Sequence, residues 1–474
     1  MRHTLVRLTG LLIALMLVLT GCNLIGIDPI MQLDEDFAAL KKQYSGVLAK
    51  YDGGEITQED IMASYTSQYS YMSQLYSMYG MSMPSSAGTD ILQTVVEDRV
   101  KSIAIEKQME ARGLSLDADK LSELQAEADE HYQDAYDSFY ANAKGDTDAV
   151  RAKQTEYDLA TYGYTKDALY AIEVAEANQE LIEQTVRDEI TEVTDEELQA
   201  AYDAKVAEDE ESYSASTGSF ESAMTSDDGV VAWMPEGYRT VKHILVKPED
   251  DILSAVKTAR NALSDAESDI EDLKAELEAL NAPAEATEDE AEDAEPTEAP
   301  RTAEEIQADI DAAEASLDGL KADVEKAEAD CLASVQDKLD EIYGKLEAGE
   351  DFASLIELYG EDPGMQNEPS KSRGYYVCAD STTWDKNFTA GAMALENVGD
   401  YSKTPVISTS GVHIIRYESD VTPGAVALDD IRDALYEETL ETMKSDHYTS
   451  EEEAWITALN PQYTLDAFNM GSSK

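Results

Sequence analysis

The stretch that decides the fold is Tyr238–Lys247, YRTVKHILVK. Its β-branched and aliphatic residues predict a short β-strand, and His243, one of five histidines in the chain, stands in its middle. A second strand-like run, Gly411–Arg416 (GVHIIR), places His413 in a matching apolar setting. We expect these two strands to lie together and to frame one active site.

Length and charge narrow the class of protein. The chain has 474 residues, which indicates more than one domain. It carries 35 Lys and Arg residues against 100 Asp and Glu residues, a formal net charge of -65. A surface this acidic repels nucleic acid and favours neutral or basic partners, so we exclude nucleic acid as a partner.

The N-terminus has the pattern of a targeting segment. A basic start precedes the apolar run Leu11–Leu19, which is too short for a comfortable membrane span. The tetrapeptide LTGC at 19–22 follows, and it resembles a bacterial lipobox, where a signal peptidase cuts before a lipid-modified cysteine. We therefore predict a lipoprotein signal peptide at 1–21, lipidation of Cys22 and a tether at 22–33.

The predicted lipid also indicates where the protein resides. Two or more acyl chains hold a protein firmly on a bilayer, whereas one chain alone is marginal. We expect the protein on the bacterial cell membrane, anchored on the extracytoplasmic face. The alternative is an ordinary signal peptide in which the cysteine stands by chance.

The two other cysteines, Cys331 and Cys378, have neither a CxxC partner nor a nearby histidine cluster. This spacing predicts no metal site and no disulfide framework.

The region 34–207 has mainly helical patterns. Thr57 followed by Asp60 is typical of a capping box at a helix start, and Thr89–Arg112 has apolar residues at helical spacing with Gly113 behind it. Tyrosines and methionines in Ile61–Met83 form a stripe, read either as a packed helix or as an adaptable surface for unfolded polypeptides. The Ser-, Gly- and acid-rich residues that follow predict a linker at 208–235.

Heptad spacing predicts an inserted coiled coil. Apolar residues recur every seven positions in two runs, Val256, Leu263, Ile270, Leu277 and Ile310, Leu317, Val324, Cys331. Residues 282–300 between them lack this period and predict an acidic tip that is either disordered or a solvated turn of the hairpin. We therefore predict an antiparallel hairpin at 251–334 with arms of roughly 40–45 Å. One arm of an intermolecular coiled coil is the alternative.

With 251–334 set aside, residues 236–250 and 335–420 resemble a parvulin-type peptidyl-prolyl cis-trans isomerase. The matching motifs follow the order of that family: KHIL at 242–245, KL at 345–346, Gly349, DFA at 351–353, YGED at 359–362, PV at 405–406, SG at 410–411 and HII at 413–415. The region 34–207 in turn resembles the helical chaperone module of PrsA/SurA-type foldases.

The resemblance implies roles for individual residues. It implies catalytic His243, Asp362, His413, Ser408 and Ser410, and substrate-binding Phe388, Trp384 and Arg373.

Two departures from the family bear on efficiency. Ser372–Tyr375 replaces a glycine-rich run, and Trp384 is larger than the methionine often found there.

The implied reaction needs no cofactor. An X–Pro bond rotates against a barrier of about 18–20 kcal/mol, and no covalent bond breaks. An apolar pocket for the proline ring and a hydrogen-bond network that stabilises the twisted amide are enough.

We therefore predict an α+β protein: a parvulin domain with a small antiparallel sheet, an inserted coiled-coil hairpin, and an α-helical chaperone lobe. The lobe would combine 34–207 with a C-terminal helical segment at 421–474. The predicted function is a membrane-anchored foldase that isomerises X–Pro bonds in unfolded or partly folded secreted polypeptides. The alternatives are a catalytically inactive holdase and an adaptor lipoprotein that acts through its coiled coil.

Overall fold

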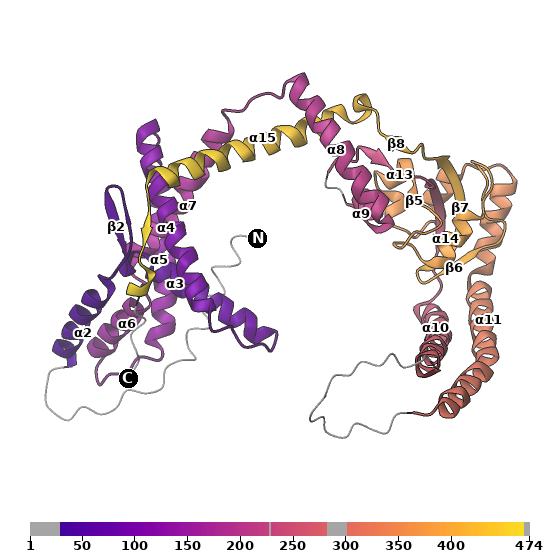
Figure 1. Ribbon diagram of the computed structural model, residues 1–474, viewed down its shortest axis with the longest axis horizontal. Coiled ribbons are helices and arrows are strands. Elements are labelled where there is room, and N and C mark those ends of the chain that lie inside the picture. Colours follow the sequence, from indigo (N-terminus) through magenta and orange to yellow (C-terminus); the bar gives the residue numbers. More distant parts are fainter. Residues whose placement is uncertain (1–28, 227–228, 282–300, 469–474) are drawn as a thin grey trace. The chain divides into compact units, whose positions relative to one another are not determined.

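A computed structural model describes residues 29–226, 229–281 and 301–468 (Figure 1). The predicted signal peptide, lipidation at Cys22 and acidic tip 282–300 lie outside the described residues. The chain divides into two compact units, residues 1–193 with 439–474, and residues 194–438. Each unit is described by itself below. Helices and small antiparallel sheets together confirm the α+β class.

The first unit is mainly helical. Its elements are α2 (Pro29–Tyr44), β1 (Val47–Tyr51), β2 (Gly54–Thr57), α3 (Gln58–Met78), α4 (Ala87–Arg112), α5 (Ala118–Tyr140), α6 (Asp148–Thr161), α7 (Lys166–Arg187), the last part of α15 (Leu428–Ala458), β9 (Gln462–Tyr463) and a 3-10 turn, η3 (Leu465–Ala467). Thr57 and Asp60 form the predicted capping box, and Gly113 ends α4 with a φ of 69°.

The core of the first unit joins segments from both ends of the chain. Val96 and Val100 of α4 are buried in one cluster with Trp455 and Leu459 from the C-terminal segment. The sheet has the order β2-β1-β9, so the strand nearest the C-terminus pairs with β1.

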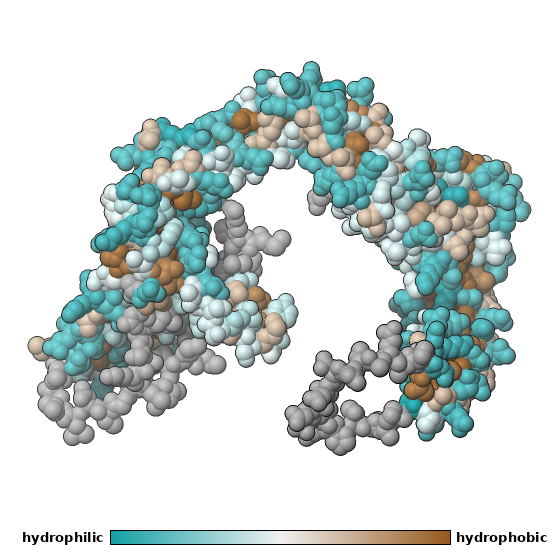
Figure 2. All heavy atoms as spheres, viewed as in Figure 1, coloured by the Kyte–Doolittle hydropathy of each residue, from teal (hydrophilic) through white to brown (hydrophobic). Residues whose placement is uncertain are grey.

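The tyrosine and methionine stripe divides between core and solvent. Tyr65 is buried in the core, whereas Met78, Tyr79 and Met81, where α3 ends, are 68%, 66% and 56% exposed. Elsewhere the face in Figure 2 is covered largely by hydrophilic residues, as the net charge requires.

The second unit is built around a four-stranded antiparallel sheet. Its elements are α8 (Asp195–Ala215), α9 (Thr217–Thr225), β3 (Trp233–Met234), β4 (Arg239–Val246), α10 (Asp250–Asn281), α11 (Ala303–Glu347), α12 (Phe352–Tyr359), η2 (Gly364–Gln366), α13 (Ser370–Arg373), β5 (Tyr375–Val377), α14 (Lys386–Met393), β6 (Val406–Ser408), β7 (Gly411–Asp420), β8 (Gly424–Ala425) and the start of α15. The sheet order is β5-β4-β7-β6, and β3 pairs separately with β8.

The two faces of this sheet bury different partners, because side chains alternate along a strand. Ile244 and Ile414 point to one face, where they pack with Leu339 of α11 and Leu355 of α12. The other face packs Val241, Val377 and Ile415 against α14. His243 and His413, one position before Ile244 and Ile414, share the α14 face.

Helices α10 and α11 lie against each other in Figure 1 and run antiparallel. Arg260 pairs with Glu328, and further along α10 Lys274 pairs with Glu314, so the partner number falls as the α10 number rises. The boundary predicted at 334–335 falls inside unbroken α11, because this helix carries its buried side chains onward from the helical pair into the sheet core.

The predicted linker at 208–235 is wrong in part. It contains the end of α8 and all of α9. Phe220 of α9 is fully buried and meets the rings of Tyr213, Tyr238 and Tyr376 edge-on, with centroids 4.6–5.4 Å away. The polar composition concealed this helix because polar contacts help to hold it: the buried Glu221 accepts hydrogen bonds from the Thr382 and Thr383 amides.

We expect Phe220→Ala to destabilise the second unit by about 3–5 kcal/mol, because it leaves a cavity among the three tyrosine rings. Hydrogen exchange of the β4 amides measures the change. Leu358→Ala, at a side chain 64% exposed on α12, is the control and should change stability by less than about 0.5 kcal/mol. Equal effects of the two substitutions would contradict the docking of α9.

Candidate active site

Strand pairing brings the two predicted histidines together. In the β4–β7 ladder, His243 stands opposite Ile415 and Leu245 stands opposite His413. The histidines are therefore diagonal neighbours on one face, within reach of each other. Both are buried, and their Nδ1 atoms lie 2.8 Å apart.

A row of hydrogen bonds runs through the pair. His243 Nε2 lies 2.8 Å from Asp362 Oδ2, and Ser408 Oγ lies 2.6 Å from His413 Nε2. The backbone N–H of Ser410 donates to Ser408 Oγ at 2.9 Å, while the Ser410 side chain is exposed. Four of the five residues predicted as catalytic thus meet through their side chains, and Ser410 joins through its amide.

Asp362 is held ionised. Burial alone would raise its pKa, but hydrogen bonds from His243, from the Tyr375 hydroxyl and from the Gly364 amide outweigh it and lower the pKa to about 2. An ionised carboxylate only accepts hydrogen bonds, so His243 Nε2 carries a proton and donates it.

His413 is held neutral. Burial first, and then the neighbouring His243, lower the pKa of its imidazole to about 2. A neutral ring donates through one nitrogen and accepts through the other. Two arrangements follow: Nδ1 donates to His243 and Nε2 accepts from Ser408, or both bonds reverse when His243 carries a second proton. In the second, the Ser408 hydroxyl hydrogen is free to donate elsewhere.

Tyr375 is a site residue that sequence analysis did not single out. Its hydroxyl donates to Asp362 Oδ2 at 2.8 Å, and burial followed by this bond raises the pKa of the phenol. Tyr375 stands opposite Val241 on β5, which places it beside His243. The sequence did contain a sign of this role, because Tyr375 stands in the segment where the parvulin family has a glycine-rich run.

Aromatic side chains wall this row. Phe388 of α14 is buried and meets the rings of His243 and His413 edge-on, at 5.2 Å and 5.1 Å between centroids. Trp384 stacks on Tyr375 at 4.5 Å. Phe388 thus places apolar surface beside the histidines, Trp384 lies next to Phe388, and the role of both as substrate contacts stays a prediction.

Asp385 fixes the position of α14. Its carboxylate accepts from the Asn387 and Phe388 amides at the helix start, at 2.9 Å and 3.4 Å. Its second oxygen accepts from the Thr409 amide at 3.0 Å. One side chain therefore ties the helix that carries Phe388 to the turn behind Ser408.

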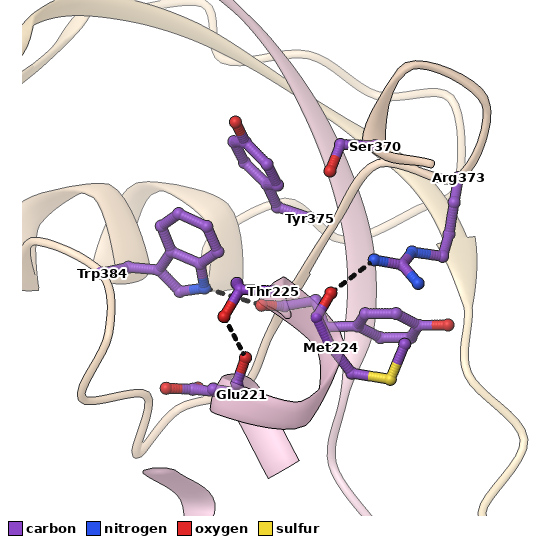
Figure 3. Close-up of a pocket in the computed structure, with 8 residues that line it drawn as sticks. Glu221, Met224, Thr225, Ser370, Arg373, Tyr375 and Trp384 are labelled. Atoms are coloured by element: carbon purple, nitrogen blue, oxygen red, sulfur yellow. Dashed lines mark hydrogen bonds between the residues drawn. The ribbon is translucent and has the colours of Figure 1, made fainter. Parts of the chain in front are cut away.

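Arg373 lies away from the histidines. It lines a pocket with Glu221, Met224, Thr225, Ser370, Tyr375, Tyr376 and Trp384 (Figure 3). Its guanidinium donates to the Met224 carbonyl at 2.9 Å and stacks over Tyr376. The structure thus joins Arg373 to α9. Tyr375, which also lines this pocket, is the lining residue that donates to Asp362 of the row.

Neither a group of three potential metal ligands nor an apolar helix of membrane-spanning length occurs in residues 29–226, 229–281 and 301–468.

Comparison with known proteins agrees with the geometry. Residues 320–419 match the family model "Rotamase: PPIC-type PPIASE domain". The chain thus carries a parvulin-type peptidyl-prolyl cis-trans isomerase domain, which confirms the predicted resemblance. The matched residues include Asp362, Phe388, Ser408 and His413. Strand β4 with His243 lies outside the matched range, because the inserted helices α10 and α11 separate it from the rest of the domain.

Solved foldase structures resemble the chain at low identity. Foldase PrsA of Streptococcus pneumoniae is 16% identical with a TM-score of 0.21, over 80% of this chain and 87% of that one. A structure reported for the SurA-like chaperones PEB4 and Cj1289 of Campylobacter jejuni is 14% identical with a TM-score of 0.21, over 74% and 97%. PrsA of Bacillus anthracis is 12% identical with a TM-score of 0.17, over 78% and 99%.

The search of curated protein sequences found no match. The class therefore rests on the family model and on the arrangement of the site.

The neutral state of His413 makes the stability of the second unit depend on pH. The unfolded histidine takes up a proton below about pH 6.5 and the folded one does not until about pH 2. Stability therefore falls on acidification, by about 1.4 kcal/mol per pH unit between pH 6 and 4. Asp362, with its folded pKa lowered, adds a loss in the same direction between about pH 4 and 2.

We expect His413→Gln to remove the first of these losses, because glutamine does not titrate. The free energy of unfolding of the second unit, followed by β4 hydrogen exchange at pH 7, 6, 5 and 4, measures it. The difference between wild type and variant should shrink steadily as the pH falls. A difference independent of pH would mean that folded His413 takes up a proton as readily as the unfolded residue.

Proposed function

We propose that the protein is an extracytoplasmic peptidyl-prolyl cis-trans isomerase and foldase, held on the cell membrane by lipid, that assists secreted polypeptides. The observation that carries this proposal is the continuous row from Ser408 through His413 and His243 to Asp362, walled by Phe388. The row lies in the parvulin-type domain, and its polar atoms are partnered before any substrate arrives.

The proposed mechanism is electrostatic and breaks no covalent bond. The planar amide carries partial negative charge on its carbonyl oxygen, and twisting the C–N bond reduces that charge because it removes the amide resonance. An ionised Asp362 beside the carbonyl disfavours the planar form and so favours the twisted one. Phe388 holds the proline ring, while the Ser408 hydroxyl, freed when the histidine bonds reverse, is a donor for the peptide.

The proposed substrates are unfolded or partly folded polypeptides with X–Pro bonds. The net charge of -65 favours neutral or basic segments over acidic ones. Trp384 and Arg373 are proposed to contact residues that flank the proline, because their pocket adjoins Tyr375.

We expect His243→Ala and Asp362→Ala to lower kcat/KM for an X–Pro tetrapeptide about 10- to 100-fold, because each change breaks the row. A protease-free isomerisation assay on the full chain measures the rate. His447→Ala is the matched control, since this histidine pairs with Glu189 in the first unit and should leave the rate unchanged.

A wild-type rate equal to the uncatalysed rate, or equal rates in the wild type and both variants, would contradict the proposed isomerase activity. Suppression of client aggregation that survives loss of both histidines would then favour a holdase. The exposed Met78, Tyr79 and Met81 support that second candidate, because adaptable apolar side chains suit irregular clients.

The membrane attachment has its own test. We expect Cys22→Ala to move the protein from the membrane fraction to the soluble fraction of cells and to abolish incorporation of radiolabelled palmitate. Cys331→Ala, at a buried thiol, is the matched control and should behave as wild type. Unlabelled wild-type protein, or equal membrane binding of the Cys22 variant, would contradict the anchor.

A further inference from the structure

The inserted helix α10 sends one side chain to the outer edge of the catalytic sheet. Among the described strands, β6 pairs only with β7, so the opposite side of β6 faces away from the sheet. Backbone groups on such an edge need partners. Arg260 of α10 supplies one, because its guanidinium donates to the Ile407 carbonyl at 3.0 Å.

The same guanidinium makes two further contacts. Its Nε and Nη2 atoms donate to Glu328 Oε1 of α11, at 2.9 Å and 2.6 Å. It also faces Asn387 of α14, whose side-chain oxygen, in the orientation that satisfies both groups, accepts from Arg260 at 2.8 Å and 3.1 Å. One residue thus bridges α10, α11, α14 and β6.

Arg260 bonds to Ile407 of β6 and to Asn387 of α14, and in each element the next residue belongs to the site. Ile407 directly precedes Ser408, which binds His413, and Asn387 directly precedes Phe388, which walls the histidines. A displacement of the Ile407 carbonyl would shift the Ser408 hydroxyl, and a displacement of Asn387 would shift the Phe388 ring. Small displacements of this kind are costly in a preorganised site.

We propose that Arg260 is a positioning residue of the isomerase site. The end of the α10–α11 pair next to the sheet, where Arg260 pairs with Glu328, therefore contributes to the geometry of that site. The planar guanidinium suits this place, because its fixed fork reaches a carboxylate, a carbonyl and an amide oxygen together. Lysine has a single ammonium group and cannot reproduce that geometry.

The distal part of the helical pair has no such role. Lys274 pairs with Glu314 at 2.7 Å, but the two side chains are 54% and 47% exposed. The Arg260 and Glu328 side chains are 18% and 31% exposed, and Arg260 donates a hydrogen bond to the sheet at the Ile407 carbonyl. The pair at 274 and 314 is therefore a matched control: the same helices, the same kind of ion pair, and a position away from the site.

The inference rests on the proposed isomerase function, and its experiment has two arms on the full chain. We expect Arg260→Ala to lower kcat/KM for an X–Pro tetrapeptide about tenfold, with partial recovery in Arg260→Lys and wild-type rates in Lys274→Ala. In the second arm, ¹⁵N spectra of the imidazoles of His243 and His413 should change in Arg260→Ala, because the Ser408 bond shifts. They should stay unchanged in Lys274→Ala.

Rates and spectra of Arg260→Ala equal to those of wild type, or the same losses in Lys274→Ala, would overturn the positioning role. Thermal unfolding of each variant separates a local shift from loss of the fold, because positioning predicts changed imidazole signals in a folded second unit. Should wild type itself prove inactive, the proposed function fails, while the imidazole spectra still decide whether Arg260 positions the site.

Discussion

The 2.8 Å contact between the Nδ1 atoms of His243 and His413 is the constraint on which the catalytic unit depends. Burial keeps His413 neutral, so one of its ring nitrogens donates and the other accepts, and the direction of its bond to His243 sets the direction of its bond to Ser408. Asp362 sets one end by accepting, and the Ser410 amide sets the other by donating. The register of β4 against β7 places these two rings on the same face, next to each other.

Local motifs predicted most of the site, whereas lateral packing remained hidden. His243 and His413 could be placed because a period of two puts both on one face of adjacent strands. Tyr375 was missed because its contact depends on β5 lying beside β4, an order that no local pattern records. Arg260 was missed because it is a polar residue of a heptad helix whose carbonyl partner lies 147 positions further along the chain.

Composition gave a wrong prediction at α9, where buried side chains determine the structure although most residues are small or polar. The Ser- and Gly-rich stretch around α9 has the composition of a linker, yet Phe220 packs it against Tyr213 of the preceding helix, Tyr238 and Tyr376. The reverse holds for the heptads, whose regular spacing suggested an independent hairpin. Helix α11 in fact continues without a break into the core beneath the sheet. Helical period thus predicted the elements well and their boundaries less well.

The insertion between β4 and the remaining strands has a consequence for the order of folding. The sheet cannot close until the chain has been made as far as β7, because β4 needs that strand as its neighbour. Helices α10 and α11 contact each other more than any other element, so the two helices can begin to pair before β7 is made. Once paired, they shorten the loop that separates β4 from its partners and so reduce the entropy lost when the sheet forms. The insertion that divides the domain in sequence therefore helps to assemble it in space.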